Sequence, residues 1–301
     1  MKKTNPLIIA KKISNSISNS IGVKKASLSE PEFSKNDIKC VTNTILSSYV
    51  STYGNEIKRF ENKIAKFTNS KYAVAVVNGT AALHLSLKIL GTKKNDEILI
   101  PSMTFIATAN AISYCNAIPH FVEIENDNLG IDPIKLEKYL KSIVKIKNGL
   151  CINKHTKRYI KGIIPVHMFG HPSKIKEIIK VAKKFNLFVL EDAAEALGSF
   201  YKGKHLGTFS EIGILSFNGN KIITTGGGGM ILTKNKNLWK EANHLSKTAK
   251  VNHQFEFIHD NIGYNYRLPN LNAALGLSQL RVLKKRIKNR RQLFHKYFKA
   301  F

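Results

Sequence analysis

Three short polar segments of the chain could carry chemistry, because each follows a stretch that is predicted to be a buried strand. They are Asn78-Gly79-Thr80-Ala81, Glu191-Asp192 and Asn218-Gly219-Asn220-Lys221. In a parallel α/β sheet, ligands bind beyond the carboxyl ends of the strands. We therefore expect side chains from these three segments to meet in one crevice.

Each segment also has an ordinary explanation when it is taken alone. Gly79 and the free amides of a helix start could seat an anion, but they could equally form a plain capped helix. Asp192 could point into the crevice or cap a helix. Lys221 could be a surface charge beside a flexible glycine turn at 226–229. The order of residues here does not match the phosphate-binding loop G-x-x-x-x-G-K-[ST].

Taken together, the three segments match the needs of pyridoxal phosphate. This cofactor requires a cradle for its phosphate, an acid that keeps its ring nitrogen protonated, and an amine that binds it covalently. Gly79 and Thr80, Asp192, and Lys221 supply these groups in that order. The sequence therefore predicts a pyridoxal phosphate site.

The elements that must position these residues alternate along the chain. Strands are predicted at 72–77, 97–100, 118–124, 159–168, 187–190, 212–217 and 230–233. Helices are predicted at 37–46, 55–67, 81–90, 106–113, 133–144, 173–185, 237–245 and 270–297, with Ser173 as the cap of its helix and a helix or loose arm within 1–27. This alternation predicts an α/β layered fold with a mostly parallel sheet.

The chain is strongly basic, with 48 Lys and Arg against 20 Asp and Glu and a formal net charge of +28. Only seven of the 48 are Arg, the residue that readers of nucleic acid use most. The lysines are spread along the chain, so we expect solvated surfaces and no nucleic-acid partner. Residues 281–298 are densely basic with apolar residues at helical spacing, which predicts an amphipathic helix that packs on its own protein or forms a binding arm.

Other features exclude several classes of protein. The 301 residues include three scattered Cys, which exclude a disulfide framework and a cysteine zinc site. His167 and His171 are separated by residues that break a helix, so no metal site is expected. No segment reaches the ~18 apolar residues of a membrane span. The apolar run at 6–10 is too short for a secretory signal, so we expect a cytoplasmic protein without a membrane partner.

The sequence resembles the DegT/DnrJ/EryC1/StrS family of sugar aminotransferases. Members of this family are fold type I pyridoxal phosphate enzymes that act on nucleotide-linked keto-sugars, with a large domain built as three layers around a mostly parallel sheet. The stretches that carry the resemblance are 75–84, 101–108, 165–170, 191–198, 216–226 and 263–268. Residues 28–31 and 49–54 resemble the branch that makes UDP-linked 4-amino sugars of the bacillosamine or legionaminic type.

The resemblance implies a role for individual residues. Lys221 would bind the cofactor and move protons during catalysis, and a lysine here supports transamination, since relatives with histidine dehydrate sugars instead. Asp192 would pair with the ring nitrogen, and Glu195 would lie near the ring hydroxyl. The remaining cofactor residues would be Gly79, Thr80, Ala81 and Ser216 at the phosphate, Phe105 on the ring face, and Asn265 and Arg267 near the cofactor of the partner in a homodimer.

The resemblance also implies an activity and a domain plan. The enzyme would transfer an amino group from an amino acid, glutamate in most relatives, to C4 of a nucleotide-linked 4-keto-6-deoxysugar for cell-surface polysaccharides, with ping-pong kinetics. We expect an N-terminal extension (1–27), a large cofactor-binding domain (28–262) and the start of a small C-terminal domain (263–301). Family members run past this length, so the small domain is expected to be truncated.

Three other readings of the sequence stay open. One is a nucleic-acid-binding protein, which the net charge alone suggests. The chain could be an inactive or regulatory relative that keeps the fold. It could also be a fold type I enzyme with another activity, such as amino-acid transamination, although the stretches around Pro101 and Gly263 favour a sugar substrate.

Overall fold

A computed structural model describes residues 5–301 of the chain. Within this range, seven strands form the central sheet: β1 (Tyr72–Val76), β2 (Glu97–Pro101), β3 (Ile118–Val122), β6 (Ile160–Ile163), β7 (Phe188–Asp192), β10 (Ile212–Ser216) and β11 (Gly229–Thr233). Their order across the sheet is β1-β11-β10-β7-β6-β2-β3. Neighbouring strands are parallel except where β11 pairs with β1 and β10. The predicted mostly parallel sheet is therefore confirmed.

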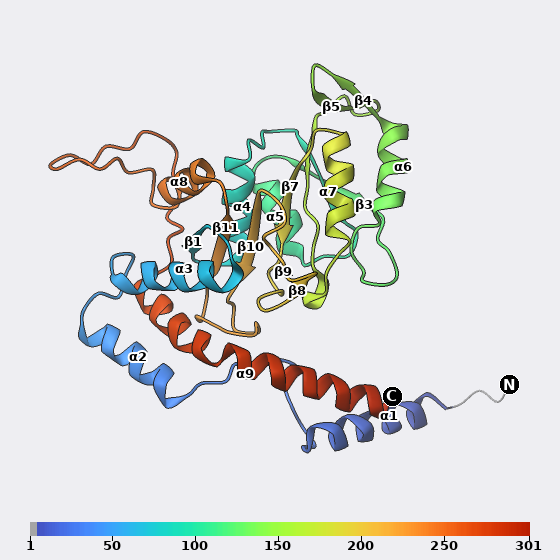
Figure 1. Ribbon diagram of the computed structural model, residues 1–301, viewed down its shortest axis with the longest axis vertical. Helices are drawn as coiled ribbons and strands as arrows, with labels where there is room; N and C mark the ends of the chain where they lie inside the picture. The colour runs from blue at the N-terminus through green and yellow to red at the C-terminus, as the bar shows by residue number, and fades with distance from the viewer. Residues whose placement is uncertain (1–4) are drawn as a thin grey trace.

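Helices account for most of the remaining chain. Over residues 5–301 they are α1 (Pro6–Ile21), α2 (Lys35–Leu46), α3 (Asn55–Thr68), α4 (Gly79–Ile89), α5 (Ile106–Tyr114), α6 (Pro133–Ile143), α7 (Ile175–Lys184), α8 (Lys236–Leu245) and α9 (Asn270–Ala300). α1 lies beside the second half of α9 and buries none of its own side chains (Figure 1). It falls in the predicted extension, of which residues 1–4 lie outside the described range.

The sheet is covered on both faces, because alternate residues of a strand point to opposite sides. On one face, Val74 and Val76 of β1 pack into a core with α4, α5 and α8. On the other face, Ala73 and Ala75 pack into a core with α3 and α9, while a third core joins β2, β6 and β7 to α6 and α7. These layers form the predicted α/β architecture.

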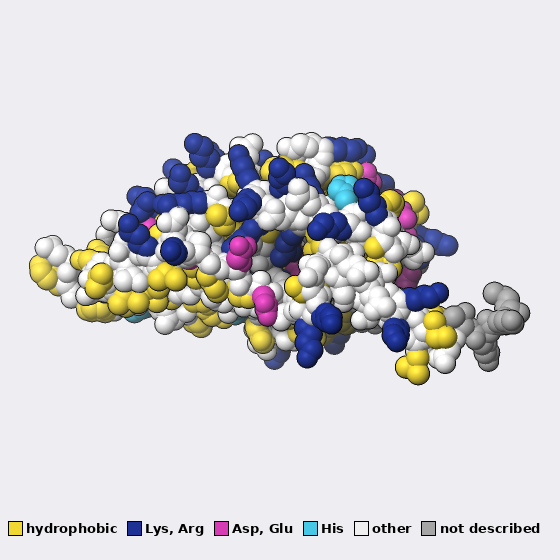
Figure 2. Space-filling model, turned by 90° about the horizontal axis from the view of Figure 1, so that it is seen from below, with side chains coloured by type: hydrophobic (Ala, Val, Ile, Leu, Met, Phe, Trp, Pro, Cys, Tyr) yellow, Lys and Arg dark blue, Asp and Glu magenta, His cyan; other side chains and the backbone are white. Residues whose placement is uncertain are grey.

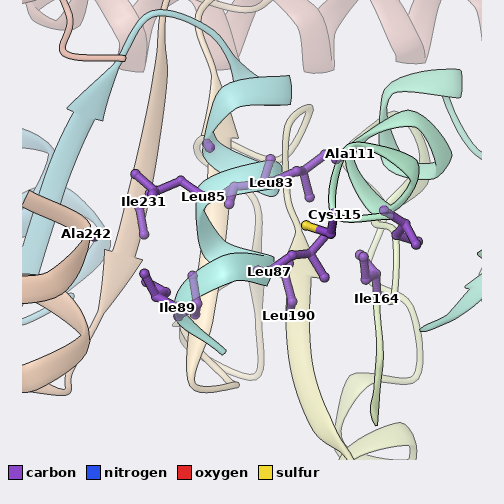
Figure 3. Packing of buried hydrophobic residues seen from close by; sticks show 14 of the residues in the cluster. Leu83, Leu85, Leu87, Ile89, Ala111, Cys115, Ile164, Leu190, Ile231 and Ala242 are labelled. Atoms are coloured by element: carbon purple, nitrogen blue, oxygen red, sulfur yellow. The ribbon is translucent and has the colours of Figure 1, made fainter. Parts of the chain in front are cut away.

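The helix that carries the first candidate segment is held by the first of these cores. Leu83, Leu85 and Leu87 of α4 are almost completely buried and lie between Ile231 and Leu190 of the sheet (Figure 3). Removing one such leucine side chain costs about 2–5 kcal/mol. The start of α4 is thus fixed relative to the strand ends.

Two predictions about the segment 159–175 are wrong. The strand predicted at 159–168 ends at Ile163, and the chain then turns through a 3-10 helix, Met168–Gly170. Phe169 and Gly170 have positive φ angles there (51° and 82°), which no strand allows. Ser173 does not cap α7, because its amide and hydroxyl contact His167 instead.

Two hairpins were absent from the predicted elements. They are formed by β4 (Val144–Lys147) with β5 (Leu150–Asn153), and by β8 (Phe200–Tyr201) with β9 (Lys204–His205). Their turns, Asn148-Gly149 and Lys202-Gly203, have positive φ at both positions, as two-residue hairpin turns require.

The surface agrees with the diffuse charge expected from the sequence. Figure 2 shows Lys and Arg side chains scattered over the visible face, with hydrophobic side chains gathered along its lower edge at the left. Across residues 5–301, no helix combines the length and the apolar character that crossing a membrane requires.

Candidate active site

The three candidate segments meet at one end of the central sheet. Asp192 is the last residue of β7, Ser216 is the last residue of the adjacent parallel strand β10, and Gly79 is the first residue of α4. A Cβ atom added to Gly79 would lie 3.1 Å from Cβ of Ser216. Glycine therefore allows the start of α4 to approach the end of β10 closely.

The start of α4 offers free backbone donors. Asn78 caps the helix, because its Oδ1 accepts a hydrogen bond from the Ala81 amide at 2.7 Å. No hydrogen bond within the described residues uses the amides of Gly79 and Thr80. With the Ser216 hydroxyl beside them, these two amides form a site suited to an anion. The Ala81 amide, which the resemblance assigned to the phosphate, is occupied by Asn78 here.

Asp192 is a buried and anchored carboxylate. Thr108 Oγ1 donates to its Oδ2 at 2.8 Å, and the Ala194 amide donates to its Oδ1 at 3.2 Å. Burial raises the pKa of Asp192 above its usual value, although both hydrogen bonds and the charges of His167 and Lys221 act in the opposite direction. A cationic group brought to this carboxylate would favour its ionised form.

Phe105 lies three residues before Thr108, whose hydroxyl group contacts this carboxylate. It is the residue before α5, the helix that carries Thr108, and its side chain is 75% exposed. The hydroxyl of Thr104 lies 2.8 Å from that of Thr108. Because Thr108 donates its hydrogen to Asp192, Thr104 must donate to Thr108. The aromatic ring is therefore available to a ligand next to an ordered chain of hydroxyl groups.

Lys221 reaches the same end of the sheet from the loop after β10. Its Nζ atom lies 2.9 Å from Glu195 Oε1, and the Lys221 side chain is 17% exposed. The second oxygen of Glu195 accepts a hydrogen bond from the Phe169 amide at 3.0 Å. Glu195 thus links the lysine loop to the turn at Met168–Gly170, and the motifs at 165–170, 191–198 and 216–226 converge.

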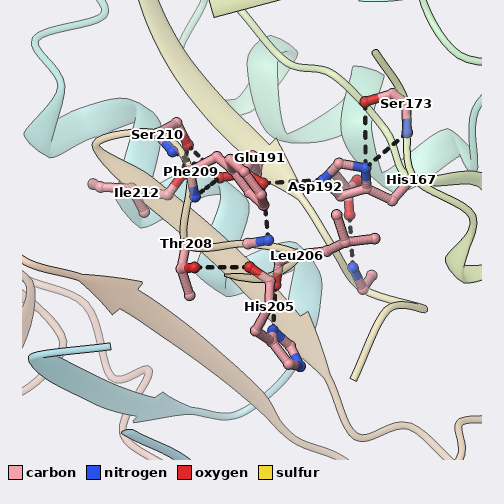
Figure 4. A network of polar contacts seen from close by, with 12 residues as sticks. His167, Ser173, Glu191, Asp192, His205, Leu206, Thr208, Phe209, Ser210 and Ile212 are labelled. Carbon is pink, nitrogen blue, oxygen red and sulfur yellow. Dashed lines mark hydrogen bonds and ion pairs between the residues drawn. The ribbon is translucent and has the colours of Figure 1, made fainter. Parts of the chain in front are cut away.

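A buried network supports the end of β7 (Figure 4). Glu191 is fully buried and points to the opposite side of the strand from Asp192. Its oxygens accept hydrogen bonds from His167 Nε2 (3.1 Å), the amides of Gly207 (2.9 Å), Phe209 (2.6 Å) and Ser210 (2.8 Å), and the Ser210 hydroxyl (2.9 Å). Burial alone would raise the pKa of Glu191, but these hydrogen bonds outweigh it and lower the pKa.

His167 has a defined protonation pattern in this network. Its Nδ1 accepts from the Ser173 amide at 3.2 Å, so Nε2 carries the hydrogen that is donated to Glu191. The His167 amide also donates to the Asp192 carbonyl at 3.0 Å. Sequence reasoning missed this role, and the signal that could have revealed it is the alternation of adjacent strand residues between the two faces.

The two remaining candidates occupy different surroundings. Arg267 pairs with Val76 at the end of β1, and its buried Nε has no hydrogen-bond partner among the described residues. Asn265 is exposed and bridges Lys247. No hydrogen bond of the described chain joins Asn265 to the other candidates.

A cavity of about 530 Å³ lies between α2, α3 and α9. Its wall includes Tyr49, Tyr53 and Gly54, from the segment that resembles the 4-amino-sugar branch, together with Arg59 and Arg281. None of the predicted cofactor residues belongs to this wall, so among the described residues the cavity and the catalytic groups are separate features.

The groups present fit pyridoxal phosphate. The free amides of α4 suit a phosphate, and the buried Asp192 lacks a cation that a protonated ring nitrogen would provide. Lys221 offers an amine within the same site. Metal chemistry has no comparable basis in residues 5–301, where no three His, Cys, Asp or Glu side chains are arranged to hold an ion.

Comparison with known proteins agrees with a pyridoxal phosphate site. The model of the DegT/DnrJ/EryC1/StrS aminotransferase family matches residues 31–301. A GDP-perosamine synthase of Escherichia coli O157:H7 is 40% identical over 90% of this chain and 70% of its own length. EpsN of Bacillus subtilis (strain 168), which is named as a pyridoxal phosphate-dependent aminotransferase, is 39% identical over 92% of this chain and 69% of its own.

A solved structure is also similar. Helicobacter pylori PseC, an aminotransferase involved in the biosynthesis of pseudoaminic acid, superposes with a TM-score of 0.75 at 29% identity, over 86% of this chain and 66% of its own. The chain thus spans about two thirds of the length of these relatives. It belongs to the DegT/DnrJ/EryC1/StrS family of pyridoxal phosphate-dependent sugar aminotransferases.

Proposed function

We propose that the protein transfers an amino group from an amino acid, with glutamate as the donor, to C4 of a nucleotide-linked 4-keto-6-deoxysugar. The product would serve the biosynthesis of a cell-surface polysaccharide. The observation that carries this proposal is the convergence of Asp192, Lys221 and the free amides of α4 at one end of the sheet. The names of relatives, which include GDP-perosamine synthases, support a sugar as the acceptor.

Different residues of the site would hold different parts of the cofactor. The amides of Gly79 and Thr80, with the Ser216 hydroxyl, would bind its phosphate, and Phe105 would cover its ring. Asp192 would hold the proton on the ring nitrogen. When bound, pyridoxal phosphate withdraws electrons from the carbon that bears the amino group.

Lys221 and its partner would handle protons. Lys221 Nζ would bind the cofactor and then carry a proton to and from the reacting carbon atoms, as a general acid and base. Glu195, 2.9 Å away, would hold the ammonium group in place and accept its hydrogen bond. The burial of Asp192 limits the access of water to the charged end of the site.

The nucleotide is the finer part of the proposal. Relatives named as GDP-perosamine synthases favour a GDP-linked sugar. The segments 28–31 and 49–54 resemble instead the branch that uses UDP-linked sugars. Both substrates therefore belong in the test, and the ratio of their kcat/KM values decides between them.

We also infer a homodimer with shared active sites, in which Asn265 and Arg267 approach the cofactor of the partner. Exposed apolar side chains support this inference, since Phe105, Ile106, Phe257 and Ile262 are 61–82% exposed. Light scattering on the purified protein would measure the mass of the assembly, and a monomer at all concentrations would contradict the inference.

The experiment for the activity uses the purified protein with pyridoxal phosphate, glutamate and a GDP- or UDP-linked 4-keto-6-deoxysugar. We expect 2-oxoglutarate and the 4-amino sugar to form in equal amounts. The two half-reactions should also proceed separately, so that glutamate without the sugar should yield up to one equivalent of 2-oxoglutarate per active site. A protein that binds no pyridoxal phosphate would overturn the proposal.

A further inference from the structure

The two carbonyl groups that flank Lys221 are both held from outside the lysine loop. Ser29 Oγ donates to the Asn220 carbonyl oxygen at 2.8 Å, and Arg286 Nη1 donates to the Ile222 carbonyl oxygen at 3.1 Å. Ser29 lies in the segment between α1 and α2, and Arg286 lies in α9. Two distant parts of the chain therefore contact the carbonyl groups of the residue before Lys221 and the residue after it.

These two contacts are themselves connected. Arg286 Nη2 donates to the Glu32 carbonyl oxygen at 2.6 Å, three residues after Ser29. The same oxygen accepts from Gln279 Nε2 at 3.0 Å, and Gln279 also accepts a hydrogen bond from Arg286. Gln279 is completely buried, and the Arg286 side chain is 14% exposed. The planar guanidinium group can hold two carbonyls at a fixed separation, which a lysine ammonium group cannot do.

The lysine loop, defined as residues 217–228, has little structure of its own around Lys221. The Lys221 amide donates to the Asn218 carbonyl at 3.0 Å and closes a turn over Gly219 and Asn220, but no other backbone–backbone hydrogen bond of the described chain involves residues 219–223. The end of the loop is fixed separately, because Asn272 of α9 donates to the Thr225 carbonyl at 2.7 Å. The contacts of Ser29 and Arg286 thus act on the stretch that has the fewest internal restraints.

We propose that Ser29 and Arg286 are positioning residues for Lys221. By holding the Asn220 and Ile222 carbonyls, they set the backbone from which the long lysine side chain extends, so that Nζ meets Glu195. A reacting amine that is displaced by even about 1 Å from its productive position reacts much more slowly. The proposal rests on the assignment of Lys221 as the amine that binds the cofactor, but the restraint on the loop exists without any ligand.

The test compares four single variants with the wild-type protein. Arg286→Lys keeps the positive charge but loses the planar guanidinium group, whose two terminal nitrogens contact two carbonyls. Ser29→Ala removes an exposed hydroxyl group that contributes little to folding. Ser29→Thr keeps a hydroxyl group and should behave like the wild-type protein in both measurements described below. Arg290→Lys is the matched control, because Arg290 is exposed on the same helix and has no hydrogen bond or ion pair within the described residues.

The first readout is hydrogen exchange of the amides of residues 218–226 in protein without cofactor. We expect exchange to be about tenfold faster in Arg286→Lys and about threefold faster in Ser29→Ala, with Ser29→Thr and Arg290→Lys unchanged. The second readout is the rate at which added pyridoxal phosphate is captured by Lys221, followed by visible absorbance and reductive trapping. Capture should slow by similar factors while the melting temperature stays close to that of the wild type.

The outcomes separate this proposal from the proposed function. Unchanged exchange in both Arg286→Lys and Ser29→Ala overturns the positioning role. Faster exchange with an unchanged rate of capture also overturns it, since the contacts would then be structural only. If the wild-type protein captures no pyridoxal phosphate, the proposed function fails, and the exchange rates alone decide whether Ser29 and Arg286 restrain the loop.

Discussion

Lys221 and Glu195 form an ion pair at the end of the central sheet, with Nζ and Oε1 2.9 Å apart. The pair connects two motifs that are separated in the chain by β8, β9 and β10, and the Phe169 amide holds the other oxygen of Glu195. Glu195 therefore has two functions in the structure. It balances the charge of Lys221, and it fixes the direction from which Nζ faces the site.

Replacing Lys221 with Ala should abolish amino transfer, because no other lysine among residues 5–301 pairs with Glu195 at this end of the sheet. The protein should still fold, since the side chain is partly exposed and packs in no core. Absorbance spectra with added pyridoxal phosphate, followed by reduction and peptide mapping, measure the loss of covalent binding. Lys234→Ala serves as the control at an exposed lysine with no described partner. Covalent binding that persists in Lys221→Ala would assign the role to another lysine.

Replacing Thr108 with Val should lower kcat/KM by about 10- to 100-fold, since a hydrogen bond to a charged group contributes about 1.5–3 kcal/mol. This hydrogen bond lowers the pKa of Asp192 against the effect of burial. Its loss raises that pKa further, so a smaller fraction of Asp192 is ionised at a given pH. The acidic limb of the pH–rate profile should move to higher pH. The profile of Thr104→Val should move less, because the Thr104 hydroxyl contacts Thr108 and the Phe105 carbonyl oxygen but not Asp192 itself.

The order of the main elements, and the end of the sheet at which the candidate residues meet, could be predicted from the sequence. Buried strands are short runs of apolar residues, and the polar residues that follow them stand out. Asp192 and Lys221 were found in this way, and the structure places both at the expected edge. The resemblance to a family then supplied roles that spacing alone cannot assign.

Contacts between segments far apart in the chain could not be predicted. The hydrogen-bond partners of Glu191 are His167 and the turn at 205–210. No pattern of neighbouring residues in the sequence indicates these contacts. The strand predicted at 159–168 failed for another reason. Its apolar residues continue past Ile163, and Val166 still bridges Asp192, but the regular pairing stops at Pro165, which has no amide hydrogen, and the chain turns at Met168–Gly170.

The hairpins were missed for a different reason. In β4, Lys145 and Lys147 alternate with apolar residues and resemble the charged surface found along most of the chain. Asn148-Gly149 between them is a strong local signal for a two-residue turn and could have identified this hairpin. In β8–β9, each strand has only two residues, which is too short for a pattern to be visible.

Replacing Glu191 with Gln should destabilise the protein by about 1–3 kcal/mol, the usual cost of leaving a buried hydrogen-bond donor without its acceptor. Gln has a single acceptor oxygen, so it cannot serve the amides of Gly207, Phe209 and Ser210 together. Urea unfolding measures the change. Glu137→Gln is the control, because Glu137 pairs with Lys141 and Lys184 at the surface and should contribute little. Equal effects of the two substitutions would show that the buried network is not a major source of stability.

Stability should fall in acid partly through Glu97, a buried residue at the opposite end of β2 from the active site. Burial alone would raise its pKa, but hydrogen bonds from His120, Thr156 and Asn153 lower it to about 2. A group with a lowered pKa in the folded state stabilises that state at high pH. This contribution is complete above about pH 4.5 and is lost progressively as the pH falls toward about 2.

The measurement is the free energy of unfolding between pH 7 and pH 3, for the wild type and for Glu97→Gln. The variant should be less stable at pH 7, and the difference between the two proteins should shrink as the pH falls through the range in which only the unfolded Glu97 takes up a proton. Glu123→Gln is the control at an exposed carboxylate and should keep the wild-type pH dependence. If the curves of the wild type and Glu97→Gln run parallel down to pH 3, the acid sensitivity arises elsewhere, and the hydrogen bonds to Glu97 do not hold its pKa low.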